Sequence, residues 1–489
     1  MKKSVFILVS LALLQTMFAQ TSFEEYQRQK NAKFQTFKDQ KQQDFDAYRR
    51  EKNARYAEFL KKKWGHYEAA PKDTTKPVEP VVPPIIPEPS PQPDPAPIKI
   101  DKDIIESPVP EPQPEPIVPI IPQEDQNVKK ESIVFYGTSV TISFPNPDDF
   151  KFTTLDDAGV VVAWEHLMDA KYDVVISSAL DVRKKLELCD WAYMEMIQQI
   201  CNKHYGKMSN EADMMLAYIL IQSGYKIRFA YSDSGRLYVL INSNYEIYEK
   251  SYFAIDGERF YPLNCNEHSL YISTASFDAE KSMSLQISKE QKFAYEPTAS
   301  RTISSQNGIT ATVRVNQNDI DFYNSYPTAC INDDFGTRWA AYANTPLEKK
   351  IKDSLYPPLK KAIAGKDVLE QANIILHFVQ TAFEYGYDSL IWGEDRAFFA
   401  TETLYYPYSD CEDHSILFSR LIRDILDLDV VLLYYPGHLA TAVKFNSDVK
   451  GDYLTVKGKK YIVCDPTCVG APVGMSCADE VAKVIVLND

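Results

Sequence analysis

Residues 409–423 read S-D-C-E-D-H-S-I-L-F-S-R-L-I-R, and the interpretation of the whole chain starts from this stretch. The serine and aspartate that open it are residue types that cap helices, and the apolar residues after them recur at helical spacing. The stretch therefore predicts a helix whose first turn carries Cys411. Because a helix start presents unpaired N–H groups and the positive end of its dipole, we expect a lowered thiol pKa and a nucleophilic thiolate there.

Two residues further along the chain complete a candidate catalytic triad. A turn at Pro436-Gly437 precedes His438, which opens a predicted strand, and Asp465 stands at the end of the next strand in K-K-Y-I-V-C-D-P-T. A nucleophile on a helix, a base on one strand and an orienting carboxylate on another is the arrangement of a thiol triad. We predict Cys411 as nucleophile, His438 as base and Asp465 as the residue that orients the base.

The segments D-C-E-D-H, P-G-H-L-A-T-A-V and Y-I-V-C-D-P-T, in this order, resemble the transglutaminase-like superfamily of cysteine enzymes over roughly residues 367–489. The resemblance implies a papain-like core in which a cysteine helix packs on an antiparallel sheet. It also implies the same roles for Cys411, His438 and Asp465. The family includes protein cross-linking enzymes, proteases and amidases, so the resemblance alone does not choose a reaction.

Other readings of these residues stay open. A lone cysteine can be half of a disulfide, and His414, on the same helical face as Cys411, is a rival base, although a packing role is favoured. Glu412 and Asp413 are expected to complement the helix dipole. The same residue types could bind zinc, but no fourth ligand follows, so neither a metal nor a cofactor is predicted.

The N-terminal residues have the pattern of a targeting signal. Two lysines, an apolar run and a small residue at Ala19 indicate a cleavable secretory signal peptide over residues 1–19. No other stretch is apolar for long enough to cross a bilayer. We expect an exported protein, whether periplasmic, displayed on the cell surface or secreted.

The net charge limits the classes of partner that we expect, and the cysteine content limits the number of disulfide bonds. A net charge of -15 argues against nucleic acid as a partner. The eight cysteines are too few for a disulfide scaffold, but Cys464, Cys468 and Cys477 are close enough in sequence for one loop bridge.

Aromatic residues repeat every eleven positions between residues 23 and 67, and this pattern predicts a helix over residues 20–70. One series starts at Phe23 and ends at Tyr67, and a second runs from Tyr26 to Phe59. Eleven residues make three helical turns, so the aromatic side chains form one nearly straight stripe. We expect the stripe to be covered by self-association or by a partner surface, with a lone, frayed helix as the alternative.

Prolines dominate the stretch after this helix. Of the chain's 30 prolines, 18 fall between residues 71 and 126. Such a composition favours an extended polyproline spacer over a packed domain. We expect a linker over residues 71–127 that separates the helix from the globular part.

The globular part contains an internal similarity about 200 residues apart. Its first half carries Glu211, Arg236 and Asn264 where the second half carries the three triad residues. We infer a duplicated unit whose first copy, residues 128–268, cannot perform thiol chemistry. A chance similarity of two helix-then-sheet segments is the alternative.

A strand-rich connector is expected over residues 269–335 and the catalytic copy over residues 336–489. The second copy has an aromatic-rich insertion before its nucleophile, from which Trp392, Tyr406 and Tyr408 are candidates to line a substrate cleft. Gln380, just before the insertion, either faces the site or packs in a buried helix.

The predicted fold is therefore α+β, with a duplicated transglutaminase-like core behind a long helix and a proline-rich linker. The predicted activity is attack of a thiolate on a peptide or carboxamide carbonyl, followed by hydrolysis of a thioester. Cross-linking by an amine is less favoured. The alternative is a non-catalytic surface or assembly protein that uses the same fold for binding.

Overall fold

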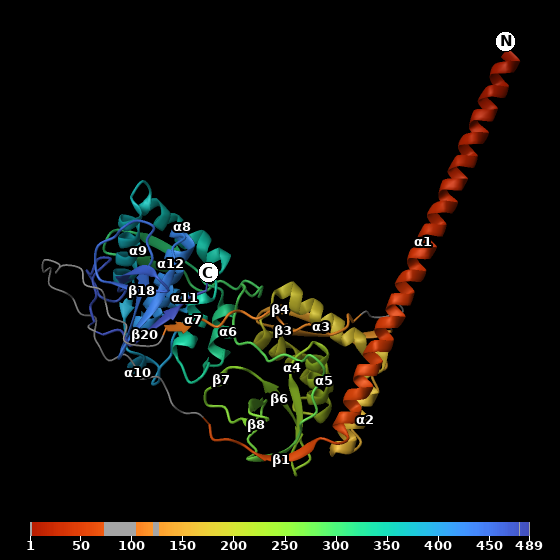
Figure 1. The fold of residues 1–489 in the computed structure, drawn as a ribbon, viewed down its shortest axis with the longest axis horizontal. Helices are drawn as coiled ribbons and strands as arrows, with labels where there is room; N and C mark the ends of the chain where they lie inside the picture. Colours follow the sequence, from red (N-terminus) through yellow and green to blue (C-terminus); the bar gives the residue numbers. More distant parts are fainter. Residues whose placement is uncertain (1, 73–103, 121–126, 479, 489) are drawn as a thin grey trace.

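The structure, a computed structural model, describes residues 2–72, 104–120, 127–478 and 480–488, and residues 2–24 by their backbone alone. The chain forms two lobes, each built on a six-stranded sheet with helices packed against it (Figure 1). A long helix, α1, projects from the first lobe. Separate helices and largely antiparallel sheets make an α+β protein, which confirms the predicted class.

The first sheet has the strand order β1-β10-β5-β6-β9-β8, and every neighbouring pair is antiparallel. All residues of β6 are buried, which explains its continuous apolar sequence L-Y-V-L-I. Because β10 is an inner strand, the first lobe extends past residue 268. The strands are β1 (Trp64–Glu68), β5 (Ile227–Tyr231), β6 (Leu237–Asn242), β8 (Phe253–Ile255), β9 (Glu258–Pro262) and β10 (Ser269–Ser273).

The second sheet has the order β2-β20-β16-β17-β19-β18, read from the edge strand that comes first in the chain. The strands of both sheets are therefore arranged in the same order. Each sheet starts with an N-terminal edge strand. If the other five strands are numbered in chain order, they follow as fifth, first, second, fourth and third. Only the edge strand differs, because β2 pairs with β20 in parallel. The strands are β2 (Ile104–Glu106), β16 (Val430–Tyr435), β17 (His438–Val443), β18 (Tyr453–Val456), β19 (Lys459–Cys464) and β20 (Lys483–Val486).

In each lobe a pair of helices precedes all strands of the sheet except the N-terminal edge strand. In the first lobe α4 packs on α5, and α5 packs on β5 and β6; in the second lobe α9 packs on α12, and α12 packs on β16 and β17. These helices are α4 (Asp190–Tyr205), α5 (Asn210–Gln222), α9 (Val368–Ala382) and α12 (Cys411–Leu426). Other elements used below are β3 (Val128–Phe135), β4 (Thr138–Pro145), α6 (Gln317–Ser325), α7 (Gly336–Asn344), α10 (Asp388–Ile391), β14 (Glu384–Tyr385) and β15 (Tyr408–Ser409).

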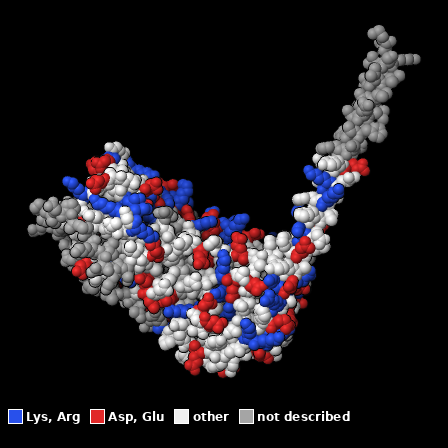
Figure 2. Space-filling model, viewed as in Figure 1, with Lys and Arg blue, Asp and Glu red and all other residues white. Residues whose placement is uncertain are grey.

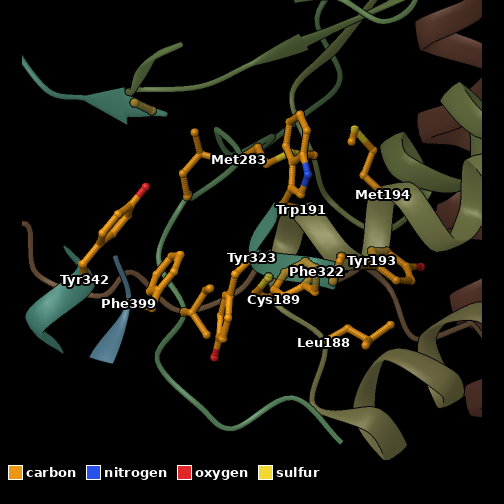
Figure 3. Packing of buried hydrophobic residues seen from close by; sticks show 14 of the residues in the cluster. Leu188, Cys189, Trp191, Tyr193, Met194, Met283, Phe322, Tyr323, Tyr342 and Phe399 are labelled. Atoms are coloured by element: carbon orange, nitrogen blue, oxygen red, sulfur yellow. The ribbon is translucent and has the colours of Figure 1, made fainter. Parts of the chain in front are cut away.

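One continuous apolar core joins the two lobes. At their junction the ring of Phe399 stacks on Tyr342 of α7, with centroids 4.0 Å apart, and on Tyr323 of α6 at 4.4 Å (Figure 3). Leu188 and Trp191 of the first lobe belong to the same core. Because buried side chains from both lobes belong to this one core, the lobes are packed together rather than merely tethered.

The long helix α1 (Lys2–Leu60) ends earlier than the sequence predicted. Tyr67 lies on strand β1 and not on the aromatic stripe, so the helix predicted over residues 20–70 is corrected at its C-terminal end. The stripe has two environments: Tyr56 is 2% exposed in the core of the first lobe, whereas Phe34 is 61% exposed on the projecting part. The aromatic repeat is the same along the helix, so it could not show which part of the stripe is buried and which part is exposed.

Polar contacts fix the last turns of α1 to the first lobe. Arg49 forms a buried ion pair with Asp173, and Gln222 Nε2 donates a hydrogen bond to Asn53 Oδ1 at 2.6 Å. Residues of the expected signal peptide continue this helix in the structure. Among the described residues, no helix is long and apolar enough to span a membrane.

Part of the expected proline-rich spacer is docked onto the body of the protein. Residues 73–103 and 121–126 of that linker lie outside the described residues. Strand β2 extends the second sheet, while Arg183 Nη2 donates to the Pro114 carbonyl at 2.8 Å in the first lobe. The stretch I-I-E at β2 lacks proline, so its backbone N–H groups can pair with a neighbouring strand. Proline residues keep their carbonyl groups, so the proline-rich part can still accept hydrogen bonds from the first lobe.

Candidate active site

Helix α12 begins at Cys411, as the sequence predicted, with Asp410 in extended backbone at the cap position. The backbone N–H of Leu439, near the start of β17, donates to the Cys411 sulfur at 3.4 Å. This contact holds the helix start beside the strand start. The Cys411 side chain is fully buried.

His438 and Asp465 are paired at the same end of the sheet. β17 begins at His438, and Asp465 directly follows β19. Strand β18 intervenes in the chain, so β19 is not the next strand in sequence as expected, but it neighbours β17 in the sheet. His438 Nε2 lies 2.9 Å from Asp465 Oδ2, which leaves Nδ1 as the nitrogen that can accept a proton.

The second carboxylate oxygen of Asp465 is held by its own turn. Oδ1 accepts hydrogen bonds from Thr467 Oγ1 at 2.9 Å and from the backbone N–H groups of Thr467 and Cys468 at 3.0 and 3.1 Å. Burial raises the pKa of Asp465, but the hydrogen bonds from His438 and Thr467 outweigh it and lower the pKa below its usual value. The carboxylate is therefore ionised and fixed against the imidazole.

Two further features secure the loop after Asp465. Gln380 of α9 donates from Nε2 to the Asp465 carbonyl at 2.9 Å and to the Ala471 carbonyl at 3.0 Å, so its role is structural support of this loop. A disulfide joins Cys468 and Cys477, which confirms the predicted loop bridge and leaves Cys464 free.

The expected lowering of the Cys411 pKa is wrong for this arrangement. Burial, together with the negative charges of Glu412 and Asp410, raises the thiol pKa well above its usual value, and the Leu439 N–H only partly opposes this. The thiol donates to Glu412 Oε2 at 3.3 Å. The nearby carboxylates and the loss of water outweigh the pKa-lowering effect of the helix start. The thiol is therefore held in its protonated form.

His414 has partners for both ring nitrogens. Nε2 lies 2.9 Å from Ser409 Oγ and Nδ1 lies 3.3 Å from the Pro466 carbonyl. Burial lowers its pKa to about 4. These contacts correspond to the packing role favoured by the sequence.

Two aromatic residues of the insertion pack edge to face. Trp392 and Tyr406 have ring centroids 4.9 Å apart, and the Arg396 guanidinium lies 4.4 Å from the Trp392 ring. Tyr408 lies on β15, which pairs with β14, and is 39% exposed. In this structure Trp392 and Tyr406 form a packed cap near the start of α12.

The three first-lobe residues that the sequence comparison matched to the triad make contacts of their own. Arg236, just before β6, forms an ion pair with Asp213 and donates from Nη1 to Asn210 Oδ1 at 3.1 Å. Glu211 Oε1 accepts from the Phe152 N–H at 3.1 Å. Asn264, after β9, adopts a φ of 53°.

Sequence reasoning did not single out Thr467 or Leu439. The D-P-T turn was a usable signal for Thr467, because an aspartate often accepts from the backbone two residues on. Leu439 acts through its backbone, which leaves no signal in residue type. In the comparisons with known proteins, no family model, curated protein or solved structure matches this chain.

Proposed function

We propose that the protein is an exported thiol enzyme of transglutaminase-like architecture that acts on peptide or carboxamide bonds. The observation that carries the proposal is the His438–Asp465 pair, whose Nε2 and Oδ2 atoms are 2.9 Å apart. The backbone N–H of Leu439, the residue after His438, donates a hydrogen bond to the Cys411 sulfur. A helix-borne thiol beside an oriented imidazole is what nucleophilic catalysis at a carbonyl requires.

Duplication of a papain-like unit is part of this proposal. The shared strand order of the two sheets and the matching helix pairs support it. In this view Glu211, Arg236 and Asn264 stand where the second lobe has its triad, and the Arg236–Asp213 ion pair has replaced a catalytic centre. The first lobe then serves as a non-catalytic partner that packs against the second.

The proposed reaction begins when the Cys411 thiol gives its proton to His438 Nδ1 and the sulfur attacks the carbonyl carbon. Collapse of the tetrahedral adduct breaks the C–N bond, and His438 returns the proton to the leaving amine. Asp465 holds the ring and stabilises its positive charge. Water, deprotonated by His438, then attacks the thioester and releases the acid and the free thiol.

Access to the thiol requires a conformational change. Because Cys411 is fully buried, substrate must displace the side chains that cover it before attack can occur. That displacement would also admit water, which removes part of the burial that raises the thiol pKa. Gating of this kind keeps an exported thiol from reacting unproductively.

Protein or peptide substrates fit the surface better than nucleic acid. The net charge is -15, and acidic and basic side chains are interspersed on the face drawn in Figure 2. The exposed part of the aromatic stripe, including Phe34 and Phe37, supports self-association or docking of α1 on a partner.

A second candidate, a non-catalytic binding or assembly protein, is favoured by the burial of Cys411 and its raised pKa. One experiment separates the two. The full chain and its Cys411→Ala variant are incubated with a mixed pool of proteins and peptides, and the products are read by mass spectrometry.

Cleaved peptides, deamidated glutamines or isopeptide links that require Cys411 would establish catalysis and its class. Cys201→Ala is the matched control, because Cys201 is equally buried but lies in the first lobe, and it should leave the products unchanged. Identical products from wild type and Cys411→Ala would reject the enzyme in favour of the binding protein.

A further inference from the structure

Three acidic side chains, Asp388, Asp395 and Glu412, meet at the start of α12. One carboxylate oxygen from each lies within 4.8 Å of the other two. Asp388 is 2% exposed, Glu412 is 0% exposed, and the side chain of Asp395 is 4% exposed. Carboxylates this close and this dry need donors, protons or a cation to be stable.

Hydrogen bonds satisfy only part of this carboxylate cluster. The Arg396 N–H donates to Asp388 Oδ2 at 2.6 Å, and Arg338 Nη2 donates to Asp395 Oδ2 at 2.9 Å. Asp395 Oδ1 and Glu412 Oε1 are buried and accept no hydrogen bond. Two oxygens with free lone pairs therefore remain inside the protein, where an unsatisfied charged acceptor is costly.

The negative charges of the cluster outnumber its positive charge. Arg338, buried at 2% exposure, places one positive charge against three carboxylates and so leaves two negative charges when all are ionised. Asp410 and Asp413, on the same helix start, are buried as well. A cation of charge +2 would neutralise the three carboxylates together with Arg338.

We propose that Asp388, Asp395 and Glu412 form a binding site for a divalent cation, with Ca²⁺ the best match. Carboxylate oxygens are the ligands that Ca²⁺ prefers, at about 2.3–2.6 Å. Three oxygens within 4.8 Å of one another have a common centre no more than about 2.8 Å from each, so a small side-chain shift brings all three to one ion. Mg²⁺ demands shorter, octahedral coordination and fits less well.

The ligands come from separate segments, which explains why no calcium-loop motif marks the site. Asp388 opens α10, Asp395 lies in the loop after it, and Glu412 is the second residue of α12. A bound ion would therefore tie the aromatic cap to the helix that carries Cys411. Ion binding stands without the proposed enzyme; only an effect of the ion on turnover rests on that function.

The test uses the full chain, freed of metal with EDTA and dialysed, then titrated with CaCl₂ by calorimetry and with Tb³⁺ by sensitised luminescence. One saturable site per chain is expected. Asp388→Asn and Glu412→Gln keep side-chain shape without charge and should weaken Ca²⁺ binding by at least about tenfold. Glu384→Gln, on the exposed strand β14 just before the cluster, is the matched control and should bind as wild type.

Each outcome decides the proposal. Absence of saturable Ca²⁺ binding up to about 1 mM, the weak end of extracellular calcium sites, would overturn it, as would unchanged binding by both variants. Equal affinity for Mg²⁺ would overturn the choice of Ca²⁺. Cys411→Ala should bind the ion like wild type, so the site can be verified even if the protein proves not to be an enzyme.

Discussion

Substitution of Gln380 by methionine tests whether the loop that carries Asp465 depends on one buried amide. Gln380 is 4% exposed and donates to the carbonyls of Asp465 and Ala471, which are themselves buried. Methionine has nearly the same length and volume but no donor, so packing is kept while two buried acceptors lose their partners. At about 1–2 kcal/mol for each carbonyl left unsatisfied, Gln380→Met should lower the free energy of unfolding by about 2–4 kcal/mol.

Denaturant titration, monitored by circular dichroism, measures this loss. Gln371→Met is the control on the same helix, because its amide donates to the Lys366 carbonyl in a more exposed position where water can replace it. We expect a change of less than about 1 kcal/mol there. A Gln380→Met protein within about 0.5 kcal/mol of wild type would refute the reasoning, since the carbonyls would then have found other donors.

Three other substitutions follow from the structure. Arg49→Met leaves Asp173 buried without its cation and should lower the free energy of unfolding by about 3–5 kcal/mol, measured by denaturation. Glu195→Gln should stabilise the protein by up to about 3 kcal/mol at pH 9 and by nothing at pH 4, because burial raises the Glu195 pKa from 4.5 to about 7. His438→Ala should reduce turnover by about 10²–10⁴-fold if catalysis is established, measured as initial rates.

The direction of the pH effect follows from the raised pKa of Glu195. In wild type, stability is greatest below the unfolded pKa and is lost as pH rises through about 7, whereas glutamine does not titrate. Parallel stability curves for the two proteins would contradict this. Lys38→Met, on the exposed part of α1, is the control for Arg49. His66→Ala, at an exposed position of β1, is the control for His438. Neither should change the measured property.

Local sequence was sufficient to place the main elements of the candidate site. A cap residue followed by apolar residues at helical spacing put the helix start at Cys411, and a proline-glycine turn put a strand start at His438. The resemblance carried by the segments around Cys411, His438 and Asp465 also implied the α+β class. These features depend on residues within a few positions of one another, so they can be recognised without the fold.

Properties set by distant residues could not be predicted in this way. The Cys411 pKa is raised because folding removes water and adds the carboxylates of Glu412 and Asp410. The end of α1, the docking of β2 and the convergence of Asp388 and Asp395 on Glu412 likewise depend on surfaces supplied by other segments. The sequence by itself determined which residue types stand at each helix and strand end. Only the tertiary structure decided their burial, their charge balance and their partners, because solvation and electrostatic interactions act through space rather than along the chain.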